Sequence, residues 1–182
     1  MTALLLAVLL APAASAAGPD AADRRQLAQA VRLYHKLDLA AALEKFDDAM
    51  SRVKEWKTAS GLRSAARWTM GDGPGAVEDA RLAAKLSPND ALSYAARGKA
   101  RLVLREYDGA LDDFRACAEA DARSVECPLG VGSALSAKGQ TRPALAPLDE
   151  AVRLDPGSAA ALLVRGSVKD RLKDFRGAAL DY

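Results

Sequence analysis

Small and bulky side chains recur along this chain at a long, regular spacing. Residues 86–89 (Leu-Ser-Pro-Asn) are similar to residues 154–157 (Leu-Asp-Pro-Gly), and the two prolines lie 68 residues apart. A repeat of half that length, 34 residues, brings further positions into register. The chain then divides into four complete units and an incomplete fifth, at residues 23–56, 57–90, 91–124, 125–158 and 159–182.

Several positions within the unit keep a side chain of similar size. Position 20 is always alanine, position 8 is always small, and position 24 is bulky in every unit but the second. Small residues at positions 8 and 20 let two antiparallel helices approach closely, and the bulky residue fills the wider gap between them. These columns are Ala42, Ala76, Ala110, Ala144 and Ala178 at position 20; Ala30, Ser64, Gly98, Gly132 and Gly166 at position 8; and Phe46, Ala80, Phe114, Leu148 and Tyr182 at position 24.

The composition favours the same architecture. Half of the residues are apolar, only 5% are aromatic, and alanine is very frequent. Alanine and leucine favour closely packed helices, whereas sheets favour β-branched and aromatic residues. We therefore expect an all-α fold.

These columns resemble the tetratricopeptide repeat family over residues 23–182. The resemblance implies a right-handed α-solenoid in which each unit contributes helix A, a tight turn and helix B. It also implies a protein that binds a protein or peptide, a function argued from the kind of fold. The third unit is the most similar, with aromatic residues, glycine and alanine where the family has them: Tyr94, Gly98, Tyr107, Ala110 and Phe114.

Local signals mark the ends of the helices. Asp90, Ser124 and Ser158 stand just before three A helices, as N-caps that accept hydrogen bonds from free amides. Gly71 and Gly139, both at position 15, mark the turn from helix A to helix B.

Two prolines predict local distortion in the fourth unit. Pro147 would lie inside helix B, where it should cause a kink, and Pro128 would lie at the end of the first turn of helix A.

Arginine at position 7 of helix A accompanies aspartate at position 23 of helix B in three units. Both are absent together in the first and fourth units, which have Gln29 with Lys45 and Val131 with Pro147. The hairpin should bring the two positions together, so we expect structural ion pairs between helices A and B. Their contribution would be at most about 1 kcal/mol if they are exposed. The pairs are Arg63 with Asp79, Arg97 with Asp113, and Arg165 with Asp181.

Residues 1–16 have the pattern of a signal peptide. Residues 4–10 form an apolar run too short to span a bilayer, and residues 14–16 (Ala-Ser-Ala) form a small-x-small cleavage site. No Lys or Arg precedes the run, and the alternative is an apolar N-terminal helix that stays attached. We expect cleavage near Ala16, a short linker over residues 17–22, and a periplasmic or secreted protein without a transmembrane segment.

Cys117 and Cys127 are candidates for a disulfide. Exported proteins meet an oxidising compartment, where two cysteines are often paired. Cys117 lies late in one helix B and Cys127 begins the next helix A, and these helices should be neighbours. The alternative is that Cys117 is only the small residue that position 27 requires, since the other complete units have Ala49, Ala83 and Ala151 there.

Groups for catalysis or metal binding are few. His35 is the only histidine, and no nucleophile elbow, metalloprotease helix or phosphate-binding Gly–Lys loop is present. The glycine-rich segment 71–75 lacks lysine and falls at a predicted turn. The formal charge is +2 with acids and bases interspersed, which gives no broad basic surface for nucleic acid. We expect no enzymatic activity, no cofactor and no metal.

By resemblance, helix A of each unit lines the concave face, where a partner would bind. An extended segment or a helix could lie there. For each residue alone, ordinary solvent-facing surface is the alternative to partner contact. The expected concave residues are Trp68, Leu92, Ala95, Lys99, Leu102, Leu129, Ser133, Ser136, Leu163, Ser167 and Asp170, with Tyr34 and His35 toward the N-terminal end.

The sequence thus predicts a non-enzymatic protein- or peptide-binding scaffold of the cell envelope. The alternative is an N-terminal regulatory or interaction array of a larger exported protein, whose functional and possibly enzymatic domain follows residue 182. Solenoids need a polar terminal cap, yet Leu172, Phe175, Leu180 and Tyr182 would be left exposed. We therefore expect either a truncated sequence or self-association through the C-terminal end.

Overall fold

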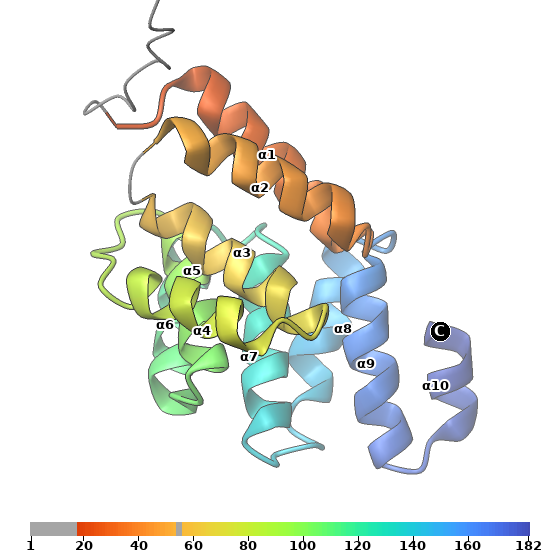
Figure 1. Ribbon diagram of the computed structural model, residues 1–182. Helices are drawn as coiled ribbons and strands as arrows, with labels where there is room; N and C mark the ends of the chain where they lie inside the picture. Colours follow the sequence, from red (N-terminus) through yellow and green to blue (C-terminus); the bar gives the residue numbers. More distant parts are fainter. Residues whose placement is uncertain (1–17, 54–55) are drawn as a thin grey trace, which may run out of the picture.

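The computed structural model describes residues 18–53 and 56–182 (Figure 1). The predicted signal peptide lies outside the described residues. The described chain folds into helical hairpins, so the predicted all-α solenoid is confirmed. The helices are α1 (Ala21–His35), α2 (Leu39–Arg52), α3 (Lys57–Thr69), α4 (Gly73–Ala83), α5 (Ala91–Val103), α6 (Tyr107–Ala120), α7 (Glu126–Ala137), α8 (Leu145–Leu154), α9 (Ala159–Arg171) and α10 (Phe175–Asp181). Odd-numbered helices are the A helices of the repeat and even-numbered ones are the B helices.

Every turn from helix A to helix B contains one residue with a left-handed backbone, and these residues lie 34 positions apart. Their φ angles are 59° at Leu37, 87° at Gly71, 62° at Arg105, 85° at Gly139 and 66° at Lys173. A left-handed residue after the last helical turn lets the chain leave helix A and reverse. The sequence marks this turn with glycine in only two units, but the backbone follows the repeat in all five.

Two of the three predicted N-caps of A helices are confirmed. The side chain of Asp90 accepts from Ser93 N–H at 2.7 Å, and Ser158 Oγ accepts from Ala161 N–H at 3.2 Å. The prediction for Ser124 is wrong, because α7 begins after Val125 and has no side-chain cap.

The fourth unit is distorted where the prolines predicted it. Residues 141–144 form turns, and α8 begins only at Leu145, so that it has 10 residues where α6 has 14. Pro147 is therefore the third residue of α8, and Pro128 is the third residue of α7. The first turn of a helix has amides without an intrahelical partner, so neither proline removes a helical hydrogen bond. The expected kink is replaced by a later helix start.

The repeat columns form the core. The alanines at position 20 are all buried, and Phe46, Phe114 and Leu148 at position 24 are almost fully buried. Glycine allows the closest approach, since a Cβ at Gly130 would lie 2.2 Å from the ring of Phe114. Helices α6 and α7 could not pack at this distance with a larger residue there.

The first hairpin departs from a simple stack. Helix α1 contacts α9 as well as α3, so the A helices of the first and fifth units meet. Figure 1 shows the turn between α1 and α2 beside α9. The first hairpin therefore spans the face formed by the A helices and reaches the fifth unit.

The C-terminal end exposes apolar side chains. Of the four residues that the sequence predicted to be exposed there, three are exposed. Phe175, Leu180 and Tyr182 are 65%, 81% and 68% exposed. Leu172 is the exception, because it packs against the core cluster that contains Leu148 and Val168.

Candidate functional site

The three predicted ion pairs are present, and they are buried on the aspartate side. Arg97 Nη2 donates to Asp113 Oδ1 at 2.6 Å, and the Asp113 side chain is 2% exposed. The pairs in the second and fifth units have the same geometry, with Arg63 Nη2 at 2.6 Å from Asp79 and Arg165 Nη2 at 2.5 Å from Asp181.

A second cation, which the sequence analysis missed, completes each of these sites. It lies at position 11, one helical turn after the first: Arg67, Arg101 and Lys169. These groups lie 2.8 to 3.0 Å from the same aspartates. The signal was available, because the first and fourth units, which lack the aspartate, have leucine at position 11.

In the fifth unit, the two cations favour the ionised form of Asp181. Burial alone would raise the pKa of Asp181, but hydrogen bonds from Arg165 and Lys169 outweigh it and hold that pKa below its ordinary value. Each arginine also contacts the preceding unit, Arg63 through Asp47, Arg97 through the C=O of Leu86 and Arg165 through Asp149. These contacts within the solenoid support a structural role.

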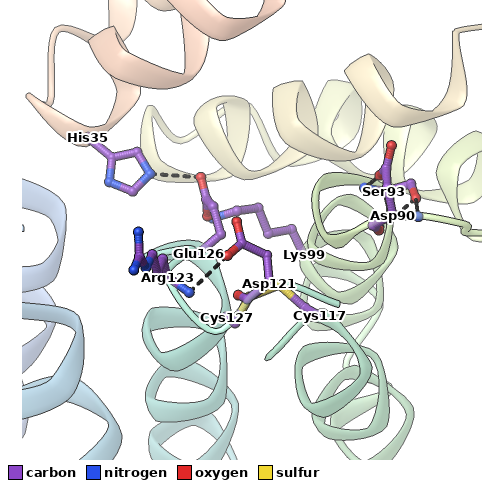
Figure 2. Close-up of a disulfide and its surroundings, with 9 residues drawn as sticks. All are labelled: His35, Asp90, Ser93, Lys99, Cys117, Asp121, Arg123, Glu126 and Cys127. Atoms are coloured by element: carbon purple, nitrogen blue, oxygen red, sulfur yellow. Dashed lines mark hydrogen bonds and ion pairs between the residues drawn. A yellow bond between two sulfur atoms is a disulfide. The ribbon is translucent and has the colours of Figure 1, made fainter. Parts of the chain in front are cut away.

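Cys117 and Cys127 form the predicted disulfide (Figure 2). It joins α6 to α7, and thus the third unit to the fourth. Both cysteines are almost completely buried, so the bond acts as a structural link within the core.

A second polar cluster lies where the first hairpin meets the fourth and fifth units. His35 Nε2 lies 2.7 Å from Glu126 Oε1, and His35 Nδ1 lies 3.1 Å from Ser158 Oγ. Lys99 Nζ lies 2.8 Å from the other oxygen of Glu126 and 4.8 Å from the ring centre of Tyr34. Figure 2 shows His35 and Lys99 approaching Glu126 from different helices. We call these five residues the closure cluster.

The charges of the closure cluster support one another. Burial alone would raise the pKa of Glu126, but the charges of Lys99 and His35 outweigh it and hold that pKa well below its ordinary value. Burial would likewise lower the pKa of Lys99, but the nearby Glu126 outweighs it and raises that pKa. Glu126 and Lys99 therefore form an ionised pair inside the protein.

Ser158, His35 and Glu126 have the composition of a hydrolase triad, but their surroundings differ from those of one. A nucleophilic serine needs a free hydroxyl at a surface that substrate can reach. Ser158 is fully buried and caps α9, and it lines none of the described cavities. The geometry instead fits a structural junction between α1, α7 and α9.

A cavity of about 450 Å³ lies beside the closure cluster, between the A helices. Every A helix contributes to its wall: Tyr34 from α1, Trp68 from α3, Lys99 from α5, Leu129 from α7 and Val164 from α9. Its volume falls within the roughly 300–1,000 Å³ of ordinary ligand pockets. We call it the concave cavity.

The predicted concave residues fall into three groups. Those that line the concave cavity are Trp68, Lys99, Leu102, Leu129 and Ser133. Ala95 is fully buried in the core, which corrects its expected place on a binding surface, and Leu92 lines a separate cavity beside Trp56. The others do not line the concave cavity: Ser136, Leu163, Ser167 and Asp170.

Burial also corrects the expected roles of Lys99 and His35. Both were placed on an open concave face, yet they are only 6% and 8% exposed, and both are held by Glu126. Sequence reasoning missed Glu126 and Ser158 as their partners. A repeat pattern predicts contacts between neighbouring units, whereas His35 and Ser158 are 123 residues apart.

Among the described residues, no group of three or more His, Cys, Asp or Glu side chains could hold a metal ion. None of the described helices combines the length and the apolar character needed to cross a bilayer.

Comparison with known proteins identifies the fold. No family profile and no curated protein matches the chain. A tetratricopeptide protein of Thermus thermophilus, TTC0263, has a similar crystal structure, with a TM-score of 0.60 and 18% identity over 88% of each chain. MamA of Desulfovibrio magneticus has a TM-score of 0.49 at 20% identity over 90% of this chain and 93% of its own, which is too distant to support a conclusion. The geometry of the hairpins, the 34-residue register of their turns and the likeness to the Thermus structure identify this chain as a tetratricopeptide-like α-solenoid.

Proposed function

We propose that this chain is a non-enzymatic scaffold that binds a segment of a protein partner on its concave side. The concave cavity carries this proposal, because A helices of all five units build it and Trp68 at its edge is 49% exposed. Ala137, the last residue of α7, is also exposed and lines the same cavity. A large exposed aromatic side chain beside an apolar cavity is typical of a binding surface.

Site-specific photo-crosslinking tests this proposal. A photoreactive phenylalanine analogue replaces Trp68 or Ala137, which both line the concave cavity, in one set of proteins and Met70 in a control. Met70 is a suitable control because it is 52% exposed and close to Trp68 in the sequence but does not line the concave cavity. We expect one discrete protein adduct from positions 68 and 137 in cells of the source organism, and none from position 70.

Equal adducts from all three positions, or none at any, would reject the concave surface as the binding face. Lys99 and Leu129 are unsuitable for this test. Both are buried, and a change at Lys99 would leave Glu126 with an unpaired charge inside the protein.

We further propose that the protein works in the cell envelope. The signal-peptide pattern of residues 1–16 supports this, and the buried disulfide suits an oxidising compartment. Expression of the whole sequence in a Gram-negative host, followed by mass spectrometry of the periplasmic fraction, is the test. We expect a chain that begins at Ala17 and carries no free thiol. A full-length, reduced chain in the cytoplasm would contradict the proposal.

Self-association through the C-terminal end stays a prediction. Light scattering of the wild type and of Leu180→Glu tests it, since Leu180 is the most exposed large apolar residue of this end. A dimer that the substitution dissociates would support the prediction, and two monomers would contradict it.

A further inference from the structure

The closure cluster blocks one end of the groove between the A helices. The last residue of α1, His35, contacts both the start of α7 and the cap of α9. Leu37 in the following turn packs against the core cluster that contains Leu129. A segment that ran the whole length of the groove would have to displace these contacts.

What remains of the groove is the concave cavity, which opens at its other end. Its exposed lining residues are Trp68, Thr69, Arg105 and Ala137, all at the C-terminal ends of A helices or in the turn after one. The cavity volume of about 450 Å³ lies in the lower half of the roughly 300–1,000 Å³ range of ordinary ligand pockets. A pocket of this size, closed at one end, suits a side chain that enters through the open end.

Arg105 is exposed to solvent at the mouth, and the lining beyond it favours an uncharged apolar group. Lys99 is the buried cation of the wall, and Glu126 at 2.8 Å compensates its charge. Ser133 Oγ donates to Leu129 C=O at 2.8 Å, so its hydroxyl hydrogen is already in a hydrogen bond and is not free for a ligand. Tyr34 and Trp68 present aromatic surface, against which another ring packs well.

We propose that the concave cavity takes one bulky, uncharged apolar side chain of the partner, above all an aromatic one, through the mouth beside Trp68. The closed first hairpin excludes a segment that runs along the groove. This inference rests on the proposed function, because it states which part of the partner enters the binding surface.

Titration with capped amino acids tests the inference on the disulfide-bonded protein. The probes are N-acetyl-tryptophanamide, N-acetyl-phenylalaninamide, N-acetyl-leucinamide and N-acetyl-lysinamide, each followed by two-dimensional ¹H–¹⁵N NMR. We expect saturable shifts of the Trp68 indole N–H and the Ser133 amide with the aromatic probes. Their affinity should exceed that of N-acetyl-lysinamide at least fivefold.

Matched variants separate the cavity from the rest of the concave face. Ser133→Phe fills the cavity and should weaken the aromatic probes at least tenfold, whereas Ser167→Phe, on exposed α9 surface, should leave their affinity unchanged. If Ser133→Phe does not fold, Trp68→Ala at the exposed mouth should weaken them instead. Absence of saturable binding, an equal response to the lysine probe, or an equal loss in Ser167→Phe would overturn the inference.

The two proposals can fail separately. Crosslinks at positions 68 and 137 without probe binding would leave the scaffold function intact and reject the side-chain pocket. Probe binding without any crosslinked partner would reject the scaffold function.

Discussion

The aspartate at position 23 is held by two cations one helical turn apart, and this changes what the ion pairs contribute. An exposed pair contributes at most about 1 kcal/mol. The Asp113 side chain, however, is 2% exposed and accepts from both Arg97 and Arg101. Removing one partner of a buried pair leaves a charge that water cannot reach, which costs about 3–5 kcal/mol.

Replacing Arg97 by leucine should therefore lower the free energy of unfolding by about 3 kcal/mol, measured by urea denaturation. Arg115→Leu is the matched control, because Arg115 pairs with Asp112 on the exposed surface of α6. It should leave the unfolding midpoint unchanged. Similar midpoints for the two variants would show that Arg101 alone satisfies Asp113.

Stability should depend on pH through Glu126. Its pKa in the folded protein lies below the ordinary 4.5, so the ionised carboxylate stabilises the fold fully above that pH and progressively less below it. The pKa of Lys99 lies above its ordinary 10.5, so its contribution is also complete at neutral pH. Glu126→Gln should destabilise the protein strongly at pH 7 and much less at pH 3, measured by urea denaturation at both. A loss that is independent of pH would contradict this linkage.

At the scale of the elements, the five hairpins have the same backbone conformation at the turn from helix A to helix B, but different residues occupy that position. Arg105 adopts φ of 62° where Gly139 adopts 85°. A left-handed backbone costs a residue with a Cβ roughly 1–2 kcal/mol, whereas glycine adopts it freely. The strain in three of the five turns is therefore held by the packing of the helices on either side.

Exchanging residues at this position should change stability in opposite directions. Gly139→Ala should destabilise the protein by about 1 kcal/mol, although a Cβ there would meet no atom within 4 Å. Arg105→Gly should stabilise it by up to about 1 kcal/mol. Thermal unfolding of both variants measures the effect. If both variants were stabilised, or both destabilised, side-chain contacts would outweigh the cost of the left-handed backbone.

The elements and their nearest contacts were predictable from the sequence, because each repeat meets its neighbours in the same way. Position 7 with position 23 predicted the Arg97–Asp113 pair, and the order of the helices predicted the disulfide. The start of α7 was less predictable, since Ser124 is a good cap in isolation but lies one residue too early. The closure cluster was not predictable, because no periodic signal links His35 to residues 91 and 123 positions away.

At the scale of the whole molecule, two links join units beyond ordinary repeat packing. The disulfide connects the third unit to the fourth, and the closure cluster connects the first unit to Glu126 at the start of α7 and to Ser158, the cap of α9. The first hairpin thus rests on a part of the solenoid that the disulfide holds together.

Reduction of the disulfide should lower the free energy of unfolding by about 2–3 kcal/mol, as expected for a bridge that closes a loop of 10 residues. Denaturation with and without reductant measures the change. The double substitution Cys117→Ala with Cys127→Ala is the control, since alanine is the usual residue of position 27, and its stability should not respond to reductant. A wild type that is equally insensitive would contradict the expected contribution.

The contact between His35 and Ser158 also bears on how the chain unfolds. In an ordinary repeat array each unit meets only its neighbours, so the terminal units can fray while the middle stays folded. Here the N-terminal hairpin is anchored 123 residues further along the chain, and its release would uncover the packing of α9 as well. Forming such a contact requires a long loop to close, which slows folding. We therefore expect the chain to unfold in one cooperative, all-or-none transition, without gradual fraying of its terminal units.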